Sequence, residues 1–165
     1  MRRLAPLFVL AFAALASPAA ADCAGGEEVF TCQIGAKSLE ICHQGDDLTY
    51  AFGPKGAPDL TITESLTTVN FIPWPGVSSS IWETVAFQNA GYVYEVWTSV
   101  ERDPEATEGR HGGIRVLQGE ETVAELECDR DTPSSSLDGI FELKESVGLC
   151  WEFGSQSWKT ACDNG

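Results

Sequence analysis

One short stretch of the chain, residues 71–82, gathers the side chains best suited to recognising a partner. Two large indole rings, Trp74 and Trp82, accompany the hydroxyls of Ser78 and Ser79. Tryptophan is a frequent anchor of protein–protein interfaces, and serine adds hydrogen-bonding groups. Prolines and a glycine stiffen and bend the backbone here, which lowers the entropy lost on binding. We therefore predict that these four residues bind a partner, although the aromatic rings of the stretch could instead simply cap the open end of a β-barrel.

No catalytic motif accompanies this stretch. The sequence lacks a G-x-S-x-G nucleophile elbow, an H-E-x-x-H zinc motif, a P-loop and a G-x-G-x-x-G phosphate loop. His43 and His111 do not have the spacing of metal ligands, and Asp129, Asp131 and Asp138 lack that of a calcium loop. We expect no catalytic residue, no metal and no cofactor. A carboxylate pair of the glycosidase type stays open, because acidic residues are abundant.

The cysteines indicate an oxidising compartment. All six follow the N-terminal apolar segment: Cys23, Cys32, Cys42, Cys128, Cys150 and Cys162. An even number of cysteines in an exported chain is typical of disulfides. We therefore predict three disulfides, whose connectivity the residues alone leave open.

The N-terminal residues predict export. Two arginines precede an apolar run over residues 4–16, which is too short to span a bilayer as a helix. Small residues of the kind that signal peptidase requires follow this run. We expect residues 1–21 to be a signal peptide that is removed. Residues 22–165 then form a single periplasmic or secreted β domain, with residues 129–165 as a C-terminal extension.

The chain is strongly acidic, with a formal net charge of −15. Removal of a signal peptide that carries Arg2 and Arg3 lowers this charge to −17. Nucleic acids and anionic membranes require a basic surface, so we expect neither as a partner after signal cleavage. Charge complementarity favours a cationic ligand or a basic protein as the partner. Solubility alone would explain the same composition.

Short alternating segments separated by turn residues predict an all-β fold. The expected strands cover residues 28–33, 38–43, 48–52, 59–64, 81–88, 91–99, 114–117, 122–128 and 148–153. Residues 65–80 are expected to form a long loop, and residues 137–145 a short helix. The fold class is therefore a disulfide-bonded antiparallel barrel or sandwich of about eight strands with a short C-terminal helix.

In chain order, several segments resemble the small periplasmic β-barrel inhibitors of c-type lysozyme. The segments are Phe30-Thr31-Cys32, residues 48–52, the serine-rich loop, residues 94–99 and Leu126-Glu127-Cys128. That family carries an S-G-x-x-Y loop whose serine and tyrosine insert into the lysozyme cleft. At the matching spacing, this chain has Ser78 for the serine, Ser79 for the glycine and Trp82 for the tyrosine. The resemblance implies a lysozyme inhibitor that acts through residues 71–82, with a disulfide between Cys32 and Cys128.

Two other kinds of function stay open. The first is a periplasmic β domain that binds a small ligand or hydrolyses one with a pair of carboxylates. A polar pocket with convergent Asp or Glu inside the fold would favour it, whereas a packed apolar interior would argue against it. The second is a structural envelope component without any binding site.

Overall fold

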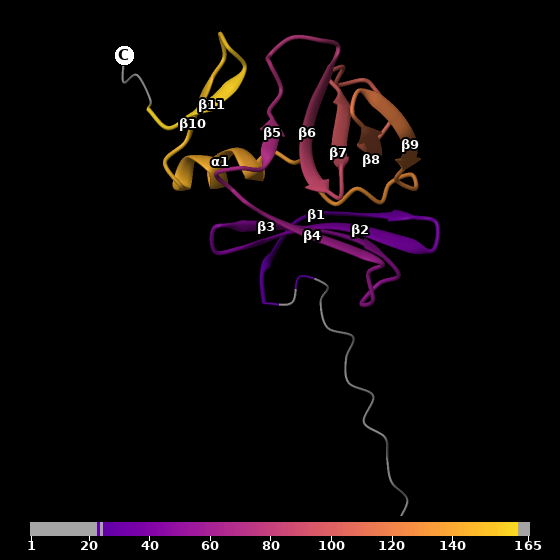
Figure 1. The fold of residues 1–165 in the computed structure, drawn as a ribbon. Helices are drawn as coiled ribbons and strands as arrows, with labels where there is room; N and C mark the ends of the chain where they lie inside the picture. Colours follow the sequence, from indigo (N-terminus) through magenta and orange to yellow (C-terminus); the bar gives the residue numbers. More distant parts are fainter. Residues whose placement is uncertain (1–22, 24, 162–165) are drawn as a thin grey trace, which may run out of the picture.

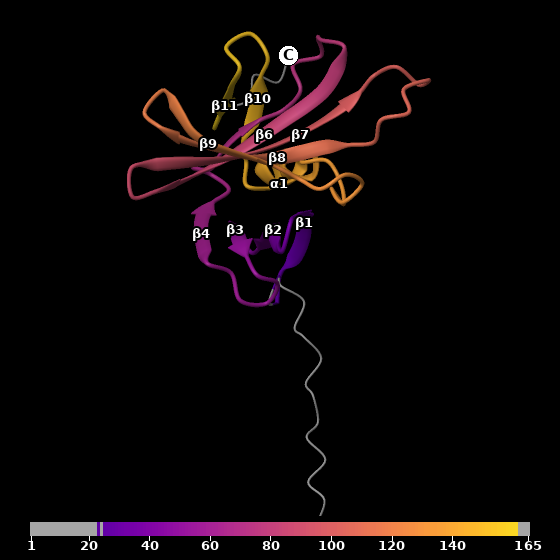
Figure 2. The same cartoon turned by 90° about the vertical axis from the view of Figure 1, so that its right-hand side faces the viewer.

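The computed structural model describes Cys23 and residues 25–161. The expected signal peptide and Cys162 lie outside the described residues. Antiparallel strands form two main sheets that lie one over the other, as Figure 1 and Figure 2 show. The expected all-β class is thus confirmed. Of the two expected architectures, the structure is the sandwich, because the two sheets are separate.

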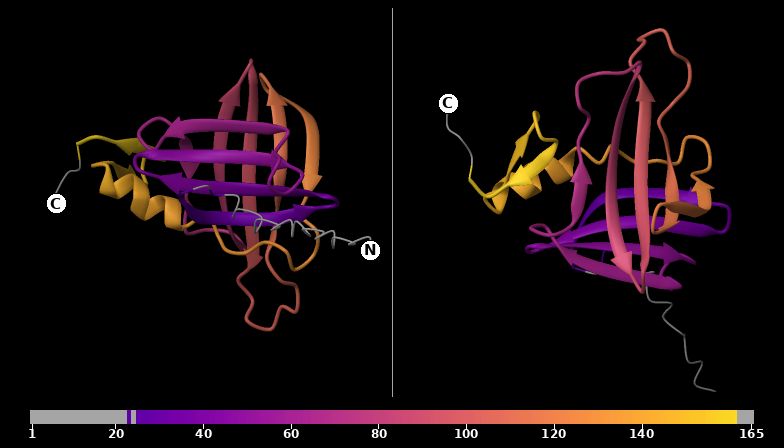
Figure 3. Two further views of the ribbon diagram at one scale, coloured as in Figure 1. Left: turned by 90° about the horizontal axis from the view of Figure 1, so that it is seen from below. Right: turned by 45° about the horizontal axis from the view of Figure 1, so that its top comes forward.

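Each main sheet is a meander whose strands follow the chain order. The first sheet comprises β1 (Glu27–Ile34), β2 (Lys37–Gln44), β3 (Asp47–Gly53) and β4 (Leu60–Ser65). The second comprises β5 (Asn70–Ile72), β6 (Ser80–Asn89), β7 (Tyr92–Glu101), β8 (His111–Gln118) and β9 (Glu121–Glu127). The strands of the two sheets cross instead of running side by side, which the left view of Figure 3 shows.

The hydrophobic core lies between the two sheets and follows from the alternation of the strands. The first sheet contributes Leu39, Ile41, Leu48 and Tyr50, and the second contributes Val85, Phe87, Val96 and Ile114. All of these side chains are at most 1% exposed. Alternation places Leu48 and Tyr50 on the inner face of β3 and Val96 and Thr98 on that of β7, and all four side chains are buried.

The C-terminal segment completes this core. It forms α1 (Gly139–Ser146), β10 (Cys150–Glu152) and β11 (Ser157–Lys159), and α1 lies beside β5 in Figure 1. Leu137 and Ile140 are fully buried among the residues of both sheets. The segment is therefore an integral part of the fold. Within the described chain, no helix is long and apolar enough to cross a membrane.

Three local expectations differ from the structure. Residues 65–80 are not one loop, because they contain β5, whose Phe71 is fully buried. The helix begins at Gly139 and not at residue 137, because Asp138 is its N-cap and accepts the Gly139 amide. The hairpin partner β11 was not expected, since three residues carry too little alternation to indicate a strand.

Two disulfides are described, Cys23–Cys42 and Cys32–Cys128. The second confirms the pairing that the resemblance implied, and it joins β1 of the first sheet to the residue after β9 of the second. Cys150 is also disulfide-bonded. No described cysteine is a free thiol.

Candidate binding surface

The β5–β6 loop (residues 73–79) projects from the end of the second sheet that is remote from the first sheet (Figure 1). Its Trp74 side chain folds back onto the loop, where the indole Nε1 donates to the Val77 carbonyl at 2.9 Å. The Arg102 guanidinium lies over the Trp74 ring, 4.9 Å from the ring centroid. A cation over an indole face is an attractive contact. Trp74 is thus an internal support of the loop.

Arg102 also holds the backbone of the loop. Its Nη1 donates to the Ser78 carbonyl at 3.1 Å, and its own amide donates to the Ser79 carbonyl at 3.0 Å. Ser78 has a φ of +108°, a conformation that residues with a Cβ rarely adopt. Such a conformation persists only where surrounding contacts fix it, and the Arg102 bonds provide these contacts. Val77 stands at the apex with 67% of its surface exposed.

The four predicted partner-binding residues therefore occupy two neighbouring places. Trp74, Ser78 and Ser79 belong to the β5–β6 loop, whereas Trp82 lies within β6. Trp82 pairs with Ser99 of β7, and both residues line a cavity on the outward face of the second sheet. Ser80, the first residue of β6, lines the same cavity and so connects it with the loop.

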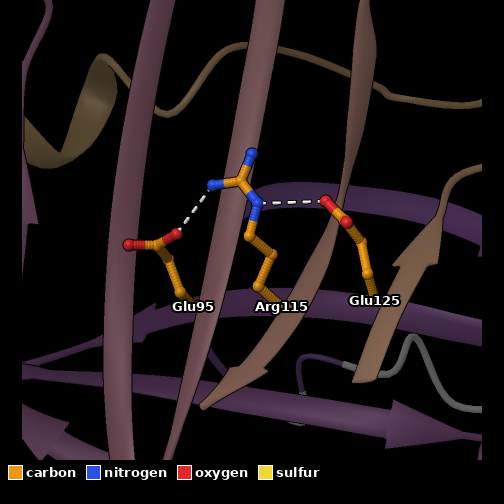
Figure 4. Close-up of polar contacts among 3 residues, drawn as sticks. All are labelled: Glu95, Arg115 and Glu125. Atoms are coloured by element: carbon orange, nitrogen blue, oxygen red, sulfur yellow. Dashed lines mark hydrogen bonds and ion pairs between the residues drawn. The ribbon is translucent and has the colours of Figure 1, made fainter. Parts of the chain in front are cut away.

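This outer-face cavity has a volume of about 500 Å³ and lies over β6, β7 and β8. Its lining includes two indole rings, two hydroxyls and an ion pair: Trp82, Trp97, Thr84, Ser99, Glu95 and Arg115. Arg115 Nη1 donates to Glu95 at 2.9 Å, and Arg115 Nε donates to Glu125 at 3.0 Å. Figure 4 shows these three side chains reaching toward one another from adjacent strands. The guanidinium also lies 5.2 Å from the centroid of the Trp97 ring.

Sequence reasoning did not single out Trp97, Glu95, Arg115 or Glu125. The alternation of residues 91–99 places Glu95 and Trp97 on one face of the strand, and this pattern is the feature of the sequence that could have indicated the cavity. The contact with Arg115 depends on the register of β7 against β8, where Glu95 lies opposite Arg115. Register across a long connection cannot be read from a single strand.

The histidines and aspartates considered as metal ligands serve local contacts. His43 hydrogen-bonds to the Gly45 carbonyl at 2.6 Å, and the exposed His111 lies 3.4 Å from Glu108. Asp129 accepts the Gly35 amide at 3.1 Å, and Asp138 caps α1. Among the described residues, no group of three His, Cys, Asp or Glu side chains is arranged to hold a metal ion.

One carboxylate is buried at the inner face of the second sheet. Glu83 is 6% exposed and accepts the Leu137 amide. Burial raises the pKa of its carboxyl, and the nearby Asp138 carboxylate adds to this effect. The Leu137 amide and the Arg110 charge oppose it. Glu83 therefore joins the C-terminal segment to β6, and its bond to Leu137 gives it a structural role.

The described surface thus offers an anchored loop with an apolar apex, beside a cavity with aromatic rings and polar groups. Both features suit binding and neither presents a nucleophile next to a base. No protein-family model matches the chain, and neither the curated proteins nor the solved structures include a match.

Proposed function

We propose that the protein is an exported interaction protein that binds a basic partner through the β5–β6 loop and the adjoining Trp82. A c-type lysozyme is the candidate partner, on the strength of the serine-rich loop. The observation that carries the proposal is the anchoring of this loop by Arg102, through two hydrogen bonds to loop carbonyls and a contact with the Trp74 ring.

Anchoring of this kind favours binding because a loop that is fixed in advance loses little entropy when its partner arrives. The apex exposes Val77 and two serines, so that an apolar contact and hydroxyl groups enter a cleft together. The internal role of Trp74 leaves the apex and Trp82 as the surfaces that contact the partner. Such a division between supporting and contacting residues is common in binding loops held by a rigid scaffold.

Charge supports a basic partner. The chain carries a net charge of −15, and opposite charges accelerate encounter and fix orientation. The disulfides favour an oxidising compartment, outside the cytoplasm. An N-terminal signal peptide that directs the chain to the periplasm belongs to the same proposal.

The test is the binding of the oxidised protein to hen-type c-type lysozyme at low and high salt, with lysis of bacterial cells measured in parallel. We expect binding that weakens with salt and inhibits lysis. Val77→Arg should weaken binding at least tenfold, because it adds bulk and a positive charge at the apex. Val123→Arg is the matched control, because it adds the same charge at an exposed valine of β9.

Two results would contradict the proposal. Absence of binding at low salt, where charge attraction is least screened, would exclude lysozyme as the partner. An equal loss in the two arginine variants would show a diffuse attraction between charges, without a role for the loop.

A further inference from the structure

The outer-face cavity has features that a protein-binding loop does not require. Trp97 pairs in register with Gly113 of β8, and a Cβ on Gly113 would lie 3.1 Å from the indole Nε1. The indole therefore lies close against the β8 backbone at a position without a side chain. The same Cβ would overlap the Leu126 carbonyl, so Gly113 also permits the pairing of β8 with β9. Trp97 is consequently a ring held against the sheet and partly exposed to the cavity.

A second ring stands diagonally from the first. Trp82 lies opposite Ser99, and Trp97 lies opposite Thr84, so the two indoles are diagonal neighbours on one face of β6 and β7. Diagonal positions on a sheet lie about 7–8 Å apart, within reach of aromatic side chains. The two rings therefore form the apolar part of the cavity.

Two hydroxyl groups lie between the rings, on Thr84 and Ser99. In the described part of the chain, no hydrogen bond occupies the side-chain hydroxyls of Thr84 or Ser99. Thr84 is only 8% exposed, and its exposed part belongs to the cavity lining. A hydroxyl at a cavity wall that bonds to no protein group can both donate to and accept from a polar ligand.

The charges of the cavity select among ligands. The Arg115 guanidinium lies over the Trp97 ring and so occupies the place where a cationic ligand would bind. Glu95 and Glu125 flank Arg115 on both sides, so that an anion would meet two carboxylates. A neutral ligand avoids both repulsions. The ligand must also carry many hydroxyls and an apolar face, to satisfy the hydroxyls and the rings together.

We propose that the outer-face cavity binds a neutral saccharide. One pyranose would stack its C–H face on the part of the Trp97 ring that Arg115 does not cover, and its hydroxyls would bond to the carboxylate of Glu95, the guanidinium of Arg115 and the hydroxyl of Thr84. A peptide fits less well, because the backbone groups of β6, β7 and β8 are already used by the pairing of these strands. The saccharide site shares Trp82 with the proposed protein contact, whereas Trp97, Glu95 and Arg115 belong to the cavity alone.

The test is calorimetric titration of the oxidised protein with cellotetraose, chitotetraose and maltotetraose. We expect at least one of the three to bind, and Trp97→Ala to weaken that binding at least tenfold. Trp97→Phe keeps a ring against Gly113 and should weaken saccharide binding only a few-fold. This variant distinguishes the loss of the ring from a folding defect in Trp97→Ala. Trp151→Ala is the matched control, because it removes a tryptophan of β10 that lies outside the cavity lining.

Three results would overturn the proposal. In the first, none of the three saccharides binds. In the second, Trp97→Ala changes neither saccharide binding nor lysozyme binding. In the third, Trp97→Ala weakens the binding of lysozyme and leaves saccharide binding unchanged. The last result would assign the outward face to the protein interface. Failure of lysozyme binding with saccharide binding intact would contradict only the proposed protein partner, so the two proposals are distinguishable.

Discussion

The outward faces of the two main sheets differ, although alternating apolar residues build both inner faces. The first sheet exposes small side chains, such as Thr49, Thr61 and Thr63, and the hydroxyls of Thr49 and Thr63 lie 2.9 Å apart. The second exposes Trp97 and Arg115 around a cavity. A face whose polar groups satisfy one another offers little to a ligand. The comparison therefore supports placing both proposed binding sites on the second sheet.

The largest effect should come from cutting the covalent link between the two sheets. Replacing Cys32 and Cys128 together by alanine should lower the free energy of unfolding by about 2–5 kcal/mol, because the bond restricts a long loop in the unfolded chain. Urea denaturation measures this loss. Replacing Cys23 and Cys42, which lie 19 residues apart within the first half of the chain, should cost about 1 kcal/mol less. Equal losses would contradict this explanation.

A smaller effect should distinguish the inner from the outer carboxylates of the second sheet. Glu83→Gln keeps an acceptor for the Leu137 amide and removes a buried charge, so it should raise the free energy of unfolding at pH 7. The raised pKa means that the folded state holds this proton to higher pH than the unfolded state does, so Glu83 destabilises the fold as the pH rises through that pKa.

The gain from Glu83→Gln should therefore shrink as the pH falls, which urea denaturation at pH 7 and pH 4.5 would show. Glu95→Gln is the matched control, because this carboxylate pairs with Arg115 on the outward face. It should give no gain at either pH. A gain from Glu83→Gln that is the same at both pH values would contradict the assignment of the raised pKa to Glu83.

The smallest changes in the free energy of unfolding are expected from substitutions on the outward faces of the two sheets. Arg115→Met should lower the free energy of unfolding by less than about 1 kcal/mol, since partly exposed ion pairs contribute little. Its saccharide binding should nevertheless be lost. Thr63→Val removes the contact with Thr49 on the first sheet and should change stability by about 0.5 kcal/mol, without an effect on binding. Binding that is equally sensitive to both changes would remove the distinction between the faces.

Much of the fold follows from local patterns in the sequence. Alternation predicted the long strands because each of them has one face on the core, as Leu48 and Tyr50 of β3 and Val96 of β7 show. Short elements such as β5 and β11 carry no such pattern, and their pairing with neighbours stabilises them. The sequence places Phe71 in the predicted binding loop although it is buried, since nothing local distinguishes a buried aromatic residue from an exposed one.

The candidate site was predictable only in part. The loop residues were recognisable from composition, but the support that Arg102 gives to Trp74 and Ser78 joins positions more than 20 residues apart. The same holds for Glu95, Arg115 and Glu125, which meet through the register of three strands. Binding of Trp74, Ser78, Ser79 and Trp82 to a partner stays a prediction.

The connectivity of the disulfides has a consequence for the order in which the chain matures. A chain that emerges from its N-terminus presents Cys23, Cys32 and Cys42 long before Cys128, which follows Cys32 by 96 residues. Cys23 can meet its native partner early, whereas Cys32 has to stay reduced or pair wrongly in the meantime. Early oxidation would thus trap mispaired chains, and their rescue would require thiol–disulfide exchange. The yield of native protein should therefore depend on a disulfide isomerase in addition to an oxidase.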